Sequence, residues 1–266
     1  MLNDITIGQF VPGDSIVHRL DPRTKIIAII PYILALFTID NWQGYLFLTV
    51  VSMAIVLLSR LPVIYVLRGL KPMVLVIAIT FPLHLFLTHG QPLFHLGPFT
   101  ASQEGLVKGT FISLRLIYLV LITSLLTLTT SPIRLTDGLE NILSPGKRFG
   151  LPAHELAMMM TIALRFIPTF LEETEKIMKA QKARGADFET GNLIRRGKNL
   201  VPLLVPLFIS AFRRADDLAL AMEARCYRGG VNRTKMVQLK FAARDGIAFL
   251  LVAVLLILSI ASRNFA

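Results

Sequence analysis

Two arginines, Arg184 and Arg225, stand 41 residues apart in closely similar local sequences. The two segments are Ala183-Arg184-Gly185 and Ala224-Arg225-Cys226. An arginine guanidinium presents five N–H donors in a rigid plane, which suits the two oxygens of a carboxylate. The pair therefore predicts either twin docking points for an acidic partner or two ordinary helix ends, since arginine near a helix C-terminus also satisfies free carbonyls.

The sequence offers little else for catalysis or metal binding. The single cysteine cannot form an intrachain disulfide or a cysteine-rich metal site. The five histidines have no HExxH or paired-ligand spacing, and neither GxxxxGK[ST] nor GxGxxG with a following helix pattern occurs. We therefore expect no catalytic residue, no cofactor, no metal site and no nucleotide-binding loop.

Each arginine ends a segment in which apolar side chains recur with the 3.6-residue period of an amphipathic helix. Between residues 163 and 184 the apolar positions are Phe166, Ile167, Phe170, Leu171, Ile177 and Met178. Between residues 200 and 225 they are Phe208, Ala211, Phe212, Ala215, Leu218, Ala219 and Met222. The opposite face of the second segment carries Arg213, Arg214, Asp216, Asp217 and Glu223. At 1.5 Å per residue, each helix would be roughly 30–40 Å long.

The rest of the chain has the composition of a membrane protein. Hydrophobic residues make up 54% of its 266 residues and charged residues only 17%, although the formal net charge is +11. Nucleic-acid-binding proteins are also basic, but they lack repeated uncharged stretches that could cross lipid. Such stretches occupy Ile26–Ile39, Trp42–Ser59, Pro72–Thr88, Leu116–Thr130 and Gly246–Ser262, and we expect the fourth span to extend backward past Arg115. Because a span needs about 20 residues, and at least about 17, we predict an all-α polytopic protein with about five transmembrane helices.

The distribution of Lys and Arg predicts the orientation and the domains. Basic residues precede the first stretch and separate the second from the third, whereas the connection after Ile39 has none, which places the N-terminus in the cytoplasm and the C-terminus outside. Residues 131–245 hold 19 Lys and Arg against 12 Asp and Glu. We therefore expect an N-terminal segment with four spans at residues 1–130, a cytoplasmic coupling domain at 131–245 and a fifth span at 246–266 of a cell-membrane protein.

Three features together resemble the transmembrane (T) component of energy-coupling-factor transporters, a class of ABC importers for vitamins and micronutrients. The first is the N-terminal run from Val11 to Lys25, VPGDSIVHRLDPRTK. The second is the pair of Ala-Arg segments at the ends of two long helices, and the third is the order of four spans, a coupling domain and a last span. The second Ala-Arg segment has Cys226 where the family has glycine, which leaves the expected helix stop to Gly229-Gly230.

The resemblance implies a non-catalytic scaffold, embedded in the lipid bilayer, that joins two ABC-type ATPases to a membrane-embedded substrate-binding (S) subunit. It implies that ATP is hydrolysed by the partner ATPases and that nucleic acid is not a partner. The ATPase-docking residues would be Ala183, Arg184, Gly185, Ala224, Arg225 and Cys226. The S-subunit or helix–helix interface would include Phe170, Ile177, Phe208, Phe212, Ala215, Ala219 and Met222.

Other interpretations of the same residues stay open. The apolar stripes could form only the core of the coupling domain. The chain could be the permease of a conventional ABC importer, although such a dimeric permease usually offers one docking element per subunit. A membrane enzyme acting on lipid or isoprenoid would need clustered Asp, His or Lys at the membrane face, and the sequence has no such cluster.

Overall fold

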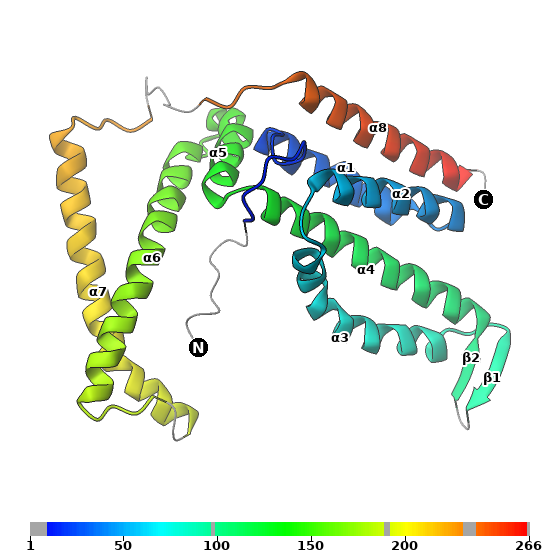
Figure 1. Ribbon diagram of the computed structural model, residues 1–266, viewed down its shortest axis with the longest axis horizontal. Coiled ribbons are helices and arrows are strands. Elements are labelled where there is room, and N and C mark those ends of the chain that lie inside the picture. Colours follow the sequence, from blue (N-terminus) through cyan, green and yellow to red (C-terminus); the bar gives the residue numbers. More distant parts are fainter. Residues whose placement is uncertain (1–9, 97–98, 189–191, 231–237, 265–266) are drawn as a thin grey trace. The chain divides into compact units, whose positions relative to one another are not determined.

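The computed structural model describes residues 10–96, 99–188, 192–230 and 238–264, and it is all-α apart from one short hairpin, as predicted (Figure 1). Its helices are α1 Pro22–Thr38, α2 Trp42–Ser59, α3 Val63–Leu87, α4 Gln103–Thr129, α5 Pro132–Leu143, α6 Ala153–Ala183, α7 Leu193–Ala224 and α8 Ala243–Asn264. Strands β1 Pro92–Leu96 and β2 Phe99–Ser102 form the antiparallel hairpin, and a 3₁₀ helix covers Ser144–Phe149. The described residues form two compact units, one from 10–142 with 238–264 and the other from 143–188 with 192–230.

The first unit is a bundle in which α1, α2, α3, α4 and α8 alternate in direction. At one end, the Lys25 Nζ donates to the Thr129 carbonyl oxygen at 3.0 Å, joining the start of α1 to the end of α4. At the other end, the Asn41 side-chain amide donates to the Ser262 carbonyl oxygen at 2.8 Å, joining the α1–α2 connection to the end of α8. The hairpin connects α3 to α4 (Figure 1).

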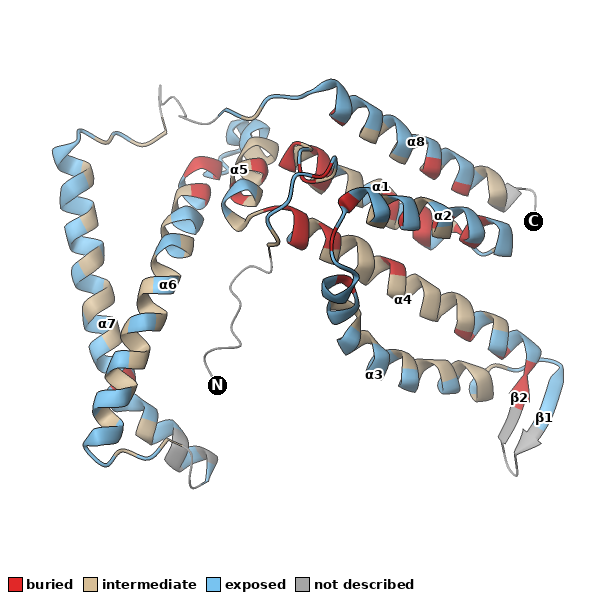
Figure 2. Ribbon diagram, in the orientation of Figure 1, coloured by how far each residue is buried: buried red, intermediate tan, exposed pale blue. Residues whose placement is uncertain are grey.

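The surface of this bundle carries many large apolar side chains that do not pack against its interior. Its core is a cluster around Tyr32, Leu36, Tyr45 and Leu48. The tyrosine hydroxyl groups in this core are hydrogen-bonded, as between Tyr32 Oη and Ser52 Oγ at 2.7 Å. Yet large apolar side chains on α2 and α3 point outward, and Figure 2 shows long exposed faces along these helices. Contiguous apolar surface of this extent is costly in water but suits lipid, in which helices satisfy their own backbone.

Four helices are long and apolar enough to cross a membrane, which confirms the polytopic prediction. They are Trp42–Ser59, Val63–Leu87, Gln103–Thr129 and Ala243–Ser262. The expected first span forms α1, a helix of 17 residues that carries Lys25 in its first turn. Helix α1 packs beside α8 and α4, two of the candidate spans. That α1 is a fifth transmembrane helix therefore remains a prediction. Neither α6 nor α7 is among the candidate spans.

Helices α3 and α4 begin well before the uncharged stretches from which they were predicted. Helix α3 starts at Val63 instead of Pro72, and α4 starts at Gln103, so that it includes Arg115 as predicted. Charged residues interrupt an apolar run without interrupting helical hydrogen bonding. Arg115 thus lies near the middle of α4. Its Nη2 reaches the Ile39 carbonyl oxygen and the Asp40 carboxylate, both at 3.3 Å, at the α1–α2 connection.

A buried polar cluster fixes the start of α1 against the start of α8. Asp21 caps α1, accepting from the Arg23 backbone N–H at 2.9 Å, and its carboxylate pairs with the Arg23 guanidinium at 2.9 Å. Burial alone would raise the pKa of Asp21, but the hydrogen bonds from Arg23 and its positive charge lower the pKa overall. Asp245, only 2% exposed, accepts from the backbone N–H groups of Asp21 at 2.9 Å and Ala242 at 2.8 Å.

Replacing Asp245 with asparagine should destabilise this unit by about 1–3 kcal/mol, because an amide can accept at only one of the two positions and leaves a buried N–H unsatisfied. The thermal unfolding midpoint of the purified chain in detergent measures the effect. Asp14→Asn is the control, since the Asp14 side chain is 94% exposed and lies 3.8 Å from its partner Arg19. Equal midpoints for the two variants would contradict the cluster's structural role.

Candidate functional site: two arginine-tipped helices

The second unit is dominated by α6 and α7, which cross each other (Figure 1). They contain 31 and 32 residues, and at 1.5 Å per residue each is about 47 Å long. Both are longer at their N-termini than the segments predicted from the apolar period. Pro168 lies within α6, and Pro202 and Pro206 lie within α7.

The two helices end in the same backbone arrangement. At the end of α6, the Ala186 N–H donates to the Gln181 carbonyl and the Gly185 N–H to the Lys182 carbonyl, both at 3.0 Å. At the end of α7, the Tyr227 N–H donates to the Met222 carbonyl at 3.0 Å, and the next bond runs from Cys226 to Glu223 at 2.8 Å. This pair of bonds, six-to-one and five-to-two, defines a Schellman cap.

The arginines occupy the equivalent C-cap position in the two caps. Arg184 follows the last residue of α6 and Arg225 follows the last residue of α7. Both side chains are exposed, and within the described part of the chain neither arginine forms an ion pair. A guanidinium held at the end of a long helix with all its side-chain donors available can bind an external carboxylate.

The residue after each arginine adopts a left-handed backbone, including the cysteine. Gly185 has a φ of 88° and Cys226 a φ of 56°. The expectation that α7 would stop only at Gly229-Gly230 is therefore wrong, because Cys226 itself takes the position that glycine holds at the end of α6. The left-handed region costs an L-residue about 1–2 kcal/mol, and the cap's hydrogen bonds offset that cost.

Cys226→Gly should therefore raise the free energy of unfolding of the second unit by up to about 1 kcal/mol, since glycine adopts positive φ without a steric penalty. Gly185→Ala should lower the free energy of unfolding by a similar amount, because alanine at this position must adopt a positive φ. No atom lies within 4 Å of the position of an added Cβ, so this conformational cost acts without a steric clash. Chemical denaturation of the two variants measures the opposite signs. A destabilising Cys226→Gly would contradict the assigned cap.

A groove of about 480 Å³ lies between α6 and α7 and is almost wholly apolar. On the α6 side it is lined by Met159, Ile162, Ala163, Phe166, Ile167 and Phe170, and on the α7 side by Ala211, Arg214, Ala215, Leu218, Ala219 and Met222. Mostly large side chains thus form the α6 wall, whereas three of the six residues of the α7 wall are alanines. Such a surface can receive a helix at close backbone distance.

Of the predicted interface residues, four line this groove and three do not. The four in the groove are Phe170, Ala215, Ala219 and Met222. Phe208 and Phe212 are 61% and 68% exposed and form a separate apolar strip along α7, and Ile177 is half-buried outside the groove.

The sequence pattern places Arg214 on the charged face of α7, and this is wrong. Arg214 lines the groove, where its Nη2 donates to Glu173 of α6 at 2.9 Å and its guanidinium lies 5.5 Å from the Phe170 ring. This ion pair joins α6 directly to α7. Arg214 and Glu173 are 41 residues apart, and the sequence gives no signal that they pair. The sequence pattern also does not find the groove residues Met159 and Ile162, because they precede the predicted helix.

Comparison with known proteins identifies the family. Residues 13–236 match the CbiQ family, described as cobalt transport protein. The chain is 58% identical over 262 residues to the energy-coupling factor transporter transmembrane protein EcfT of Thermosediminibacter oceani, covering 98% of this chain and 99% of that relative. It is 53% identical over 246 residues to the protein of the same description in Bacillus subtilis, covering 92% and 93% of the two chains. The chain therefore belongs to the CbiQ family and is a transmembrane component of an energy-coupling factor transporter.

Proposed function

We propose that the chain is the coupling subunit of an importer of vitamins or other micronutrients, and that it transmits ATP-driven motion from two ABC-type ATPases to a membrane-embedded S subunit. In this arrangement the chain hydrolyses no ATP, which is the task of the ATPases. The observation that carries the proposal is the pair of equivalent arginine caps at the ends of α6 and α7.

Each arginine cap would dock into one ATPase. The residues that would enter the two interfaces are Ala183, Arg184, Gly185, Ala224, Arg225 and Cys226. Equivalent hydrogen bonds, equivalent exposure and the small side chain on either side of each guanidinium support this assignment. Two copies of one acidic groove, one on each ATPase, could therefore accept both tips by the same bidentate contact.

The S subunit would bind the apolar face of the crossed helices. The groove offers Phe170 against Ala215, Ala219 and Met222, and the strip with Phe208 and Phe212 extends the apolar surface along α7. Ile177, half-buried on α6, would contribute to packing within the unit. The proposal therefore keeps two functions for the stripes, an internal contact at the crossing and an external contact in the groove.

Motion would pass from the tips to the groove through the helices themselves. The ion pair between Arg214 and Glu173 joins α6 directly to α7, so displacement of one tip would rotate the helices about that point. A rotation of this kind changes the width of the groove, and with it the contact offered to the S subunit.

The proposed orientation has the N-terminus and the second unit in the cytoplasm and the C-terminus outside. The end of the bundle where α1 and α8 begin and α4 ends carries Arg19, Arg23, Lys25 and Arg134. Toward the opposite end the basic residues are fewer, namely Lys108 and Arg115, and Arg115 is paired with Asp40. The positive-inside rule therefore favours the first end as cytoplasmic.

Purification of the tagged full chain from its native membrane tests the assembly. We expect two ABC-type ATPases and at least one small membrane protein to copurify in stoichiometric amounts, identified by mass spectrometry. Purified alone, the chain should bind no ATP. Recovery of the chain with no ATPase under conditions that keep other ABC importers intact would contradict the proposal.

A further inference from the structure

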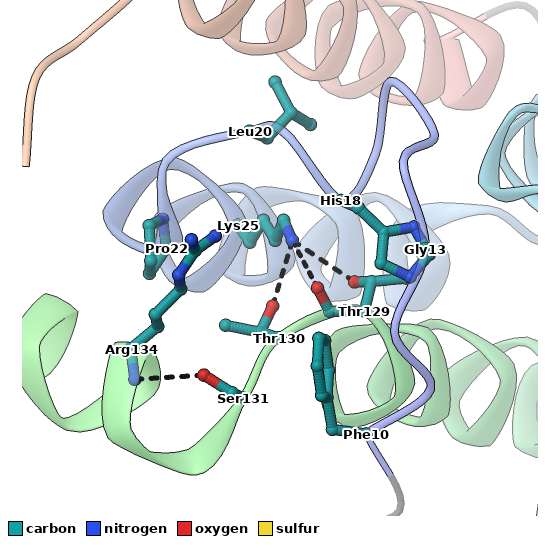
Figure 3. Close-up of a pocket in the computed structure, with 10 residues that line it drawn as sticks. All are labelled: Phe10, Gly13, His18, Leu20, Pro22, Lys25, Thr129, Thr130, Ser131 and Arg134. Carbon is teal, nitrogen blue, oxygen red and sulfur yellow. Dashed lines mark hydrogen bonds between the residues drawn. The ribbon is translucent and has the colours of Figure 1, made fainter.

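A small cationic cavity lies in the first unit, at the end of the bundle where α1 begins and α4 ends. Its volume is about 40 Å³, and it is lined by Phe10, Gly13, His18, Leu20, Pro22, Lys25, Thr129, Thr130, Ser131 and Arg134 (Figure 3). None of these ten residues is acidic, and two of them, Lys25 and Arg134, carry a positive charge. The cavity is unrelated to the arginine caps of the second unit.

Lys25 brings a buried positive charge to the cavity without an acidic partner. It is 8% exposed, and its Nζ donates to the Thr129 carbonyl at 3.0 Å, to Thr129 Oγ1 at 3.3 Å and to Thr130 Oγ1 at 3.0 Å. All three acceptors are uncharged, as Figure 3 shows. The carboxylates of Asp21 and Asp245 are engaged instead with Arg23 and with backbone N–H groups.

Arg134 adds a second positive charge at an unusual position. It lies in the first turn of α5, which contains no acidic residue, although the positive end of the helix dipole disfavours cations there. Its guanidinium forms no ion pair within the described ranges. A bound anion would offset the unfavourable interaction between Arg134 and the helix dipole, because Arg134, Lys25 and the N-terminus of α5 would all attract the anion.

The chemistry and the location together indicate the anion. The cavity lies at an end of the candidate spans α4 and α8, where phospholipid headgroups begin, and the apolar side chains of Phe10, Leu20 and Pro22 line it beside the cations. Basic pockets between transmembrane helices on the cytoplasmic side suit lipid headgroups. We propose that this cavity binds the phosphate of an anionic phospholipid, with Arg134 and Lys25 attracting the charge and the hydroxyls of Thr130 and Ser131 available to its oxygens.

Lipid retention by the full chain tests the proposal. The wild-type protein in detergent is incubated with phosphatidylglycerol or with zwitterionic phosphatidylcholine, and bound lipid is counted by native mass spectrometry. We expect one phosphatidylglycerol to be retained in preference to phosphatidylcholine. Arg134→Gln should weaken that preference about fivefold or more, since a single basic residue near an anionic membrane surface contributes about that factor.

Arg68→Gln is the matched control, because Arg68 is an exposed arginine on α3 that does not line the cavity. It should leave retention within about twofold of wild type. Arg134 is itself exposed, so its variant should fold, and the thermal midpoint checks this. Equal retention of the two lipids, or equal effects of the two arginine variants, would overturn the proposal. Displacement of phosphatidylglycerol by an equal concentration of inorganic phosphate would overturn the lipid assignment, because it would show that the cavity binds phosphate alone.

Discussion

Uptake should be abolished when Arg184 and Arg225 are both replaced with alanine, while the chain still inserts into the membrane. Each guanidinium is expected to be buried against a carboxylate on docking. Removing one partner of a buried charge pair costs about 2–5 kcal/mol, mainly because the other charge is left unpaired. ATPase copurification and ATP-driven uptake are the two measurements. Each single variant should weaken both, and the double variant should reduce them to background.

Arg165→Ala with Arg213→Ala is the matched control for charge and chemistry. These arginines are exposed on α6 and α7 but lie away from the two caps. Surface substitutions of this kind usually change stability by no more than about 0.5 kcal/mol. If the tips only satisfy helix ends, both double variants should behave alike, so wild-type uptake in the Arg184/Arg225 variant would end the docking hypothesis.

Ala219→Phe should release the S subunit while leaving the ATPases bound. Ala219 is one of three alanines on the α7 wall of the groove, and an aromatic ring there would occupy the space that a partner helix needs. Overpacked helix contacts typically cost about 1–3 kcal/mol, which corresponds to a loss of roughly 5- to 150-fold in binding. Uptake should fall with the amount of copurified S subunit, and ATPase copurification should stay near wild type.

Ala221→Phe is the control for this substitution, because Ala221 is exposed on the same helix and does not line the groove. Phe212→Ala separates the groove from the exposed strip on α7. If Phe212→Ala releases the S subunit and Ala219→Phe does not, the strip is the binding surface and the groove assignment is wrong. If all three variants keep the S subunit, neither surface holds it.

The sequence predicts those parts of the structure that depend on local chemistry. Asp21 and Pro22 specify the start of α1 because both act within one helical turn, and Ala183-Arg184-Gly185 marks the end of α6 for the same reason. The starts of α3 and α4 could not be found from uncharged runs, since a helix continues through a charged residue whose side chain reaches a partner. Arg115 reaches Asp40 in this way, across 75 positions of the chain.

Contacts between distant segments lie beyond the pattern in the sequence. An apolar period assigns a side chain to a face of its own helix but does not say where a second helix crosses, and for this reason Phe170 and Phe208 were grouped together and Arg214 was misplaced. The bond from the Asp21 N–H to Asp245 spans 224 positions. The single substitution of glycine by Cys226 misled the prediction of the end of α7, because the cap depends on backbone geometry more than on residue type.

The contact between Arg115 and the α1–α2 connection implies that the first half of α4 extends beyond the end of α2. Helix α2 has 18 residues and α4 has 27, so their lengths are about 27 Å and 40 Å, against a hydrocarbon core of about 30 Å. No single tilt matches both helices to one flat bilayer. The first turns of α4 carry Glu104 and Lys108, so this end of the helix is expected to project beyond the hydrocarbon core that α2 spans.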